Sequence, residues 1–314
     1  MMLKKEWIEQ GFIDEPVSED IDLKKEIRRL VEEKDAIILA HYYTIGDIQD
    51  IADFVGDSLA LARKAAETNA KMMVMCGVHF MAETCKLLSP DKMVLCPDLN
   101  AGCSLADSCK AEDLKKYKEE HPGYQVISYV NTTAAVKALT DVVVTSGNAK
   151  KVVDQLPKDA KLIFGPDYNL GNYINEVTGR NMLLWNGGCH VHERFSVAKI
   201  VELKQQYPDA IVMAHLECKG PVLALADVKG STATMLQYAQ QSDKKQFIVA
   251  TEAGILHEMQ RTCPDKEFIP VPPEISEGLR VGEQGSGMSG LECSCNECQY
   301  MKMNSLLKIY NALK

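Results

Sequence analysis

The chain has 314 residues, of which 46% are hydrophobic and 25% are charged, the usual mixture for a globular protein. Its 35 basic and 44 acidic side chains leave a net charge of −9, which argues against a nucleic-acid-binding surface. No apolar run approaches the roughly 18 residues needed to span a bilayer, and the segment from Met1 to Trp7 lacks the apolar core of a signal peptide. We therefore expect a cytoplasmic protein that binds neither nucleic acid nor membrane.

Three segments of the chain, starting at residues 41, 129 and 215, align with one another without a gap. In each, a polar residue that ends an apolar run is followed 12 positions later by Asp, and a hydroxyl residue follows that Asp by 5. Further apolar runs lie about 24 and about 41 residues after each Asp. Four features at fixed spacing in three places indicate a triplicated chain. The matched sets are His41, Asp53 and Ser58; Tyr129, Asp141 and Ser146; and His215, Asp227 and Thr232.

Each unit alternates a helical stretch with short apolar runs, which is typical of βαβ crossovers and a parallel sheet. Continuously apolar runs such as 36–40 and 210–214 are expected for strands covered on both faces. In chain order, the helical stretches are 23–30, 114–121 and 197–203, and the later apolar runs are 73–77, 93–95, 162–165, 182–184, 247–251 and 268–270. Units of this size are small for independent stability, so we expect them to pack against one another.

Ligands of parallel sheets lie beyond the carboxyl ends of the strands. This rule places six candidate side chains at strand ends, namely His41, Tyr43, Tyr129, Asn131, His215 and Glu217. If a pseudo-threefold axis relates the units, these side chains converge on one central cavity. One loop cysteine per unit is available at the same place, and these are Cys103, Cys189 and, after an insertion at 272–291, Cys298.

The eleven cysteines are expected to be mostly reduced thiols, because a long chain in a reducing compartment is a poor candidate for a disulfide framework. Cys103, Cys189 and the cluster at 293–298 lie among Gly, Asn and Ser, which are typical of loops that present ligands. Three thiolates cannot complete a site with four cysteine ligands, but they can hold a [4Fe–4S] cluster with one iron left open. Such an iron is a Lewis acid with a vacant position. A structural zinc held by three cysteines and either His190 or His192 is the alternative, and ligand spacing alone leaves both open.

Six runs of residues resemble the quinolinate synthase family. They are residues 40–43, 50–58, 129–131, 188–195, 215–218 and 230–232, and the resemblance extends from about residue 20 to about residue 310. It implies three αβα domains in a triangle around a [4Fe–4S] cluster. Together with the repeat, it leads us to expect an α/β fold whose domains are 1–106, 107–194 and 195–298, with 299–314 packing on the first.

The family's reaction condenses iminoaspartate with dihydroxyacetone phosphate to give quinolinate, phosphate and two waters, the first ring-forming step toward NAD. Iminoaspartate is unstable and comes from L-aspartate oxidase, so the resemblance implies that enzyme as a functional partner. On the residues alone, two other functions stay open: an iron–sulfur dehydratase of another hydroxy acid and an iron–sulfur redox sensor. A dehydratase would not need three matched anion-binding units, and a sensor would not need the His, Tyr, Glu and hydroxyl residues at the strand ends.

The resemblance makes Cys103, Cys189 and Cys298 the cluster ligands. Because residues 298–304 resemble the family's stretch after its third ligand, Cys298 is preferred over Cys293 and Cys295. A disulfide between Cys293 and Cys295 would be strained and easily reduced, since a single residue separates them.

Glu217 is the expected general base, and Tyr43 and Tyr129 are expected to donate protons or to orient carbonyl and hydroxyl groups. The repeated hydroxyls follow strand-to-helix turns, where helix N-termini present N–H donors to carboxylate or phosphate; the alternative is that they only cap helices. The expected substrate-binding residues are His41, Ser58, Asn131, Ser146, His192, His215 and Thr232. The repeated aspartates have no evident chemical role in every unit, so we interpret them as structural.

Overall fold

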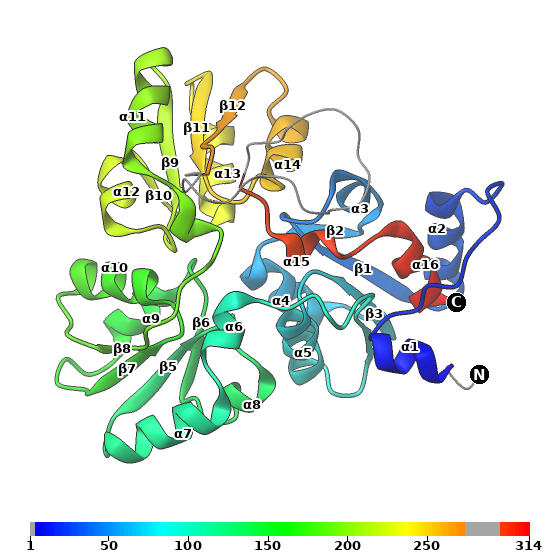
Figure 1. Ribbon diagram of the computed structural model, residues 1–314, viewed down its shortest axis with the longest axis horizontal. Helices are drawn as coiled ribbons and strands as arrows, with labels where there is room; N and C mark the ends of the chain where they lie inside the picture. Colours follow the sequence, from blue (N-terminus) through cyan, green and yellow to red (C-terminus); the bar gives the residue numbers. More distant parts are fainter. Residues whose placement is uncertain (1–3, 274–295) are drawn as a thin grey trace.

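The protein is described by a computed structural model that covers residues 4–273 and 296–314. Figure 1 shows three α/β units grouped around a common centre. Each unit has one parallel, four-stranded sheet, and the strand orders are β2-β1-β3-β4, β6-β5-β7-β8 and β10-β9-β11-β12. The three sheets therefore repeat one topology, and the predicted α/β fold of three αβα domains is confirmed. Within the described ranges, no helix is long and apolar enough to cross a membrane.

The elements follow the predicted repeat along the chain. The first unit contains α1 (Lys5–Gln10), α2 (Leu23–Glu33), β1 (Ala36–His41), α3 (Gly46–Ile51), β2 (Phe54–Gly56), α4 (Ser58–Glu67), β3 (Met72–Cys76), α5 (His79–Leu88) and β4 (Met93–Leu95). The second contains α6 (Ser104–Ser108), α7 (Ala111–Glu120), β5 (Gln125–Tyr129), α8 (Ala134–Lys137), β6 (Val142–Val144), α9 (Ala149–Gln155), β7 (Leu162–Gly165), α10 (Tyr168–Thr178) and β8 (Leu183–Leu184).

The third unit and the C-terminal segment complete the chain. They contain the 3-10 turn His192–Arg194, α11 (Val197–Gln206), β9 (Ile211–His215), α12 (Gly220–Leu225), β10 (Val228–Gly230), α13 (Thr232–Gln241), β11 (Gln246–Ala250), α14 (Ile255–Thr262), β12 (Glu267–Pro270), α15 (Gln299–Lys302) and α16 (Leu306–Leu313). Cys293, Cys295 and most of the predicted insertion at 272–291 lie outside the described residues.

Alternate side chains of each central strand face different cores, as the two-residue period of a strand requires. One core is shared by all three units and contains Leu39, Ile127 and Met213 from β1, β5 and β9. Their chain neighbours point the other way, into separate outer cores; Ile38 and Val212 are examples. The shared core holds the units together, and it leaves the carboxyl ends of the strands facing the centre of the molecule.

The repeated aspartates brace the start of each sheet. The Asp53 carboxylate accepts a hydrogen bond from the Ile38 N–H at 2.7 Å, and the Asp53 N–H donates to the Ile38 carbonyl at 3.0 Å. Asp141 and Asp227 form the same pair of contacts with Val126 and Val212. Each Asp therefore fixes the chain that enters the edge strand against the first strand of its sheet, which is a structural role.

The C-terminal segment returns to the first unit. Ile309 and Leu313 of α16 pack against Ile27 and Leu30 of α2 in the outer core of that unit, and Figure 1 shows the C-terminus beside α2. Before it reaches α2, the segment passes through α15 near the centre of the molecule. This route brings Cys298, directly before α15, into the central region. The domain boundaries at 106, 194 and 298 stay predictions.

Candidate active site

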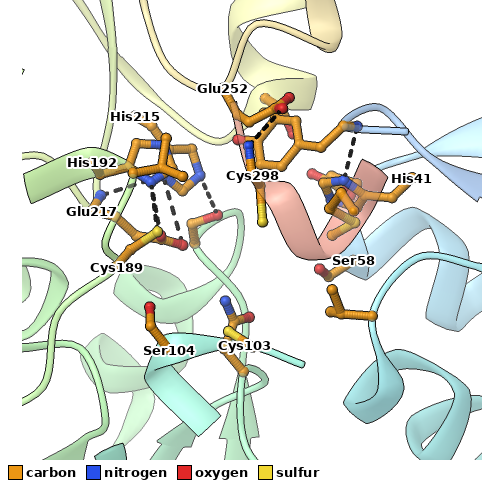
Figure 2. Close-up of a pocket in the computed structure, with 18 of the residues that line it drawn as sticks. His41, Ser58, Cys103, Ser104, Cys189, His192, His215, Glu217, Glu252 and Cys298 are labelled. Carbon is orange, nitrogen blue, oxygen red and sulfur yellow. Dashed lines mark hydrogen bonds and ion pairs between the residues drawn. The ribbon is translucent and has the colours of Figure 1, made fainter. Parts of the chain in front are cut away.

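A cavity lies where the carboxyl ends of the three sheets meet, and Figure 2 shows residues that line it. Every side chain predicted above as catalytic, substrate-binding or metal-ligating lines this cavity. These are His41, Tyr43, Ser58, Cys103, Tyr129, Asn131, Ser146, Cys189, His192, His215, Glu217, Thr232 and Cys298. The strand-end rule explains the convergence, because β1, β5 and β9 end at His41, Tyr129 and His215.

His41 and His215 occupy equivalent places and form equivalent hydrogen bonds. Nδ1 of His41 accepts a hydrogen bond from the Tyr43 N–H at 3.2 Å, and Nδ1 of His215 accepts one from the Glu217 N–H at 3.3 Å. A neutral imidazole that accepts at Nδ1 carries its proton on Nε2. Burial is the main cause that lowers the pKa of His41 to about 3 and that of His215 to about 4. Both rings are therefore neutral N–H donors near pH 7.

Two buried neutral histidines make stability depend on pH. Because the folded pKa values of His41 and His215 lie below the ordinary 6.5, the unfolded chain binds more protons as the pH falls below 6.5, and stability is lost. At pH 5 each histidine is expected to remove about 2 kcal/mol from the free energy of unfolding. Urea unfolding of cluster-free protein between pH 7 and 5 measures this loss. In the double variant His41→Asn/His215→Asn, the amide oxygens can replace Nδ1 as acceptors, and the free energy of unfolding should depend less steeply on pH. An unchanged pH dependence contradicts the assignment.

Glu217 is a buried carboxylate held by two donors. The Tyr129 hydroxyl donates to Oε1 at 2.5 Å, and Nδ1 of His192 lies 3.0 Å from Oε2. Burial alone would raise the pKa of Glu217, but His192, His215 and these hydrogen bonds hold that pKa below its ordinary value. Burial and the negative charge of Glu217 raise the pKa of Tyr129 well above its ordinary value. The pair is therefore a carboxylate and a protonated phenol.

Thr251 connects His192 of this network to Tyr43 of the first unit. Nε2 of His192 lies 3.0 Å from Oγ1 of Thr251, and its Nδ1 lies 3.2 Å from Sγ of Cys189. The Tyr43 hydroxyl lies 2.7 Å from the same Thr251 oxygen. Burial is the main cause that raises the pKa of Tyr43 well above its ordinary value, so its phenol stays protonated. Thr251 thus joins two of the predicted site residues.

The predicted hydroxyls differ in their relation to the helices. Ser58 and Thr232 are the first residues of α4 and α13, but the caps are the residues before them: Asp57 accepts from the Ala60 N–H, and Ser231 accepts from the Thr234 N–H. The capping alternative is therefore wrong for Ser58 and Thr232, whose side chains border the cavity.

Ser146 is the exception in the second unit. The sequence predicts a helix N-terminus there, but α9 begins only at Ala149, because the side chain of Asn148 accepts from the Thr145 N–H and closes a turn first. Ser146 lies in this turn, with its Oγ 3.3 Å from Nε2 of His215. The helix-terminus expectation is wrong for this residue, although its hydroxyl still reaches the cavity.

The three cysteines have similar surroundings. Cys103 and Cys298 directly precede α6 and α15, and Cys189 precedes the turn that contains His192. Burial raises all three thiol pKa values, that of Cys103 to about 12 and that of Cys298 to about 11. In each case, backbone N–H groups two and three residues further on oppose this rise. Such N–H groups stabilise thiolates, and a bound metal cation would lower the thiol pKa values further.

The spacing of the sulfurs distinguishes between the two metal sites. A single zinc has Zn–S bonds of about 2.3 Å, so its sulfur ligands lie within roughly 4 Å of one another. Among the described residues, the only three ligand atoms that all lie within 4.8 Å of one another come from Cys189, His192 and Glu217. In this structure Cys103, Cys189 and Cys298 do not form such a group, and Figure 2 shows their sulfurs bordering one larger space. This donor set fits a multi-iron cluster.

Sequence reasoning missed several residues of the site. Thr251 and the buried Glu252 follow β11, and Ser104 and His190 are hydrogen-bonded to each other although 86 positions separate them in the sequence. The strand-end rule predicts site residues at the end of the first strand of each unit. Applied also to β11, the same rule indicates Thr251 and Glu252. The contact between Ser104 and His190 has no such signal, since it joins two loops that are far apart in the sequence.

These features define a class: an enzyme of three matched α/β units whose strand ends and thiols enclose one cavity. A profile of the family described as quinolinate synthetase A protein matches residues 25–314. Quinolinate synthase from Nostoc punctiforme is 53% identical over 94% of this chain and 86% of its own length. Those from Synechocystis sp. and Chloroherpeton thalassium are each 51% identical, over 93% and 94% of this chain and 87% of their own lengths. The chain belongs to the quinolinate synthase family, whose members are iron–sulfur enzymes of NAD biosynthesis.

Proposed function

We propose that this chain condenses iminoaspartate with dihydroxyacetone phosphate in the central cavity, using a [4Fe–4S] cluster held by Cys103, Cys189 and Cys298. One observation carries the proposal: each of the three units contributes one of these thiols, and all border the cavity that Glu217, Tyr129 and Tyr43 also line. With three thiolate ligands, such a cluster has one open iron, which supplies a Lewis acid for a substrate oxygen or nitrogen.

Glu217 is the proposed general base, because it is ionised, buried and placed against a protonated phenol. Its low pKa depends on the donors Tyr129 and His192. When a substrate group takes either donor away, burial raises the pKa of the carboxylate and makes it a stronger base at carbon. Tyr129 and Tyr43 stay protonated and can pass a proton to a carbonyl or departing hydroxyl oxygen.

The substrates carry carboxylates and a phosphate, and the cavity offers dipoles for them rather than cations. No Lys or Arg occurs among the described residues that line it. Instead, α4 and α13 begin at its wall with Ser58 and Thr232, and His41 and His215 add neutral Nε2–H donors. Asn131 has a buried side-chain oxygen without a partner in the described structure, which suits a donor on the substrate. We assign Ser146 and His192 to the same binding shell.

Supply of iminoaspartate is the proposed link to a second enzyme. Because this imine hydrolyses readily, an L-aspartate oxidase in the same compartment, which we take to be the cytoplasm, has to provide it continuously. Anaerobic turnover with the oxidase, L-aspartate, an electron acceptor for the oxidase such as fumarate, and dihydroxyacetone phosphate should yield quinolinate and phosphate in equal amounts. Dehydration of a hydroxy acid without any need for dihydroxyacetone phosphate would instead favour the dehydratase alternative.

Tyr129→Phe removes one hydroxyl and leaves the ring in place. We expect the variant to keep its cluster and to bind dihydroxyacetone phosphate, but to form quinolinate roughly tenfold or more slowly, because Glu217 loses one donor and the site loses one proton source. Single-turnover quinolinate formation, compared at matched iron content, measures the effect. Loss of the cluster or of solubility would show that Tyr129 acts only by packing.

A further inference from the structure

A buried ion pair joins the C-terminal segment to the third unit. Glu252 follows β11 and its side chain is fully buried, whereas Lys302, the last residue of α15, is 20% exposed. Oε1 of Glu252 lies 2.9 Å from Nζ of Lys302. A buried carboxylate is costly unless it is paired and hydrogen-bonded, so the contacts of this pair define where both chain segments lie.

The backbone contacts of the pair reach two residues of the site. Glu252 accepts hydrogen bonds from the Cys298 N–H at 3.0 Å, shown in Figure 2, and from the Gly254 N–H at 2.7 Å. Lys302 donates to the carbonyl oxygen of Tyr43 at 2.8 Å. One ion pair thus holds the backbone of a proposed cluster ligand and the backbone of a proposed catalytic tyrosine.

A second polar residue supports the same junction. The side-chain NH2 group of Gln49 shares its two hydrogens among the carbonyl oxygens of Tyr42, Thr44 and Gly254, which lie 3.0, 2.9 and 2.9 Å from Nε2. This buried amide therefore ties the loop that carries Tyr43 to the loop that follows Glu252. The end of β1, the end of β11 and the C-terminal segment therefore meet at one polar junction.

We propose that Glu252 and Lys302 are positioning residues that couple the placement of Cys298 to the placement of Tyr43. Docking of the C-terminal segment through this pair sets the third thiol and the first-unit tyrosine at the same time. Neither side chain needs to touch substrate for this role. The inference rests on the proposed function, in which Cys298 binds the cluster and Tyr43 acts on the substrate.

Asp98 and Lys308 provide a matched control. They form another ion pair with the same exposed fractions, 0% and 20%, and they also join the C-terminal segment to the first unit. The other partners of this pair are groups of Asn100 and Met303 and the ring of Phe12, and none of these residues lines the cavity. Loss of this pair should lower stability without disturbing Cys298 or Tyr43.

The experiment compares Lys302→Met and Glu252→Gln with Lys308→Met and Asp98→Asn. Hydrogen exchange of cluster-free protein is followed in peptides that cover 41–45 and 296–302, and iron is counted after reconstitution. We expect roughly tenfold or faster exchange in both peptides of the first two variants, because the ion pair no longer holds the two backbone segments in place, together with reduced iron content. The control variants should show neither faster exchange in these peptides nor reduced iron content. Lys302→Arg, which keeps the cation, should match the parent in both measurements.

Exchange that stays at the parent level in both peptides of Lys302→Met and Glu252→Gln would overturn the proposal. So would an equal increase in the control variants, which would show a general loss of stability. Faster exchange in both peptides supports the coupling even if Cys298→Ser keeps a full complement of iron; that second result would refute the ligand assignment of Cys298 and leave the positioning role intact. The two hypotheses therefore fail separately.

Discussion

Cys298→Ser, Cys103→Ser and Cys189→Ser are each expected to lose the cluster and all activity. The three thiols come from different parts of the chain. Burial raises the pKa of each thiol, and two backbone N–H groups beside each one favour the thiolate and oppose this rise. A serine hydroxyl stays protonated near pH 7 and is a poor ligand for iron. Because a cluster with one open iron has no spare protein ligand, the loss of one thiolate leaves two, and we expect the cluster not to assemble.

Iron and sulfide counts on anaerobically purified variants measure this directly. Cys293→Ser and Cys295→Ser should keep a cluster and most activity, since Cys298 is the preferred third ligand. Cys218→Ser is a matched control, because Cys218 is fully buried, donates to the Ala250 carbonyl and does not line the cavity. An intact cluster in Cys298→Ser, or its absence in Cys295→Ser, would overturn the ligand assignment.

Glu217→Gln is expected to slow quinolinate formation by about 10² to 10⁴, the usual contribution of a general acid or base. The amide keeps the size of the carboxylate and can still accept from Tyr129, so folding and the cluster should survive. It cannot accept a proton from carbon. Turnover at matched iron content is the measurement, and a variant that retains more than about a third of the parent rate contradicts the assignment.

Glu193→Gln tests whether any carboxylate near the site would give the same result. Glu193 accepts a hydrogen bond from Asn169, which also donates to the backbone carbonyl of Glu217, but it does not line the cavity. Loss of the Glu193 carboxylate should leave most of the rate of quinolinate formation. Equal damage in both variants would indicate that the network around Asn169, rather than proton transfer by Glu217, limits turnover.

Much of the fold and of the site could be predicted because the spacing of the repeat indicates how the strands are arranged and where they end. The parallel arrangement follows from apolar runs at fixed spacing, and the ends of the first strands then identify His41, Tyr129 and His215. The aspartates were interpreted as structural because they recur without chemical need, and their contacts with the first strand explain the recurrence.

Residues that depend on packing between units could not be predicted in this way. Thr251 meets Tyr43 across 208 positions of sequence, and Glu252 meets the Cys298 N–H across 46, so neither contact has a local pattern. The turn that delays α9 was missed for a different reason: one side chain, Asn148, competes with the helix for the backbone of the residues before it. The repeat therefore predicts the arrangement of strands and helices that the three units share, and single residues such as Asn148 change it locally.

The central claim is that three thiols hold a [4Fe–4S] cluster with one iron open to the ligand in the cavity. EPR of the reduced, anaerobically purified protein with and without quinolinate tests it most directly, with phthalate, which lacks the ring nitrogen, as the control. The account predicts about four irons per chain and a signal that quinolinate changes and that phthalate at the same concentration changes less. A single ion per chain, as Cys189, His192 and Glu217 could hold, or a cluster signal indifferent to quinolinate would contradict it.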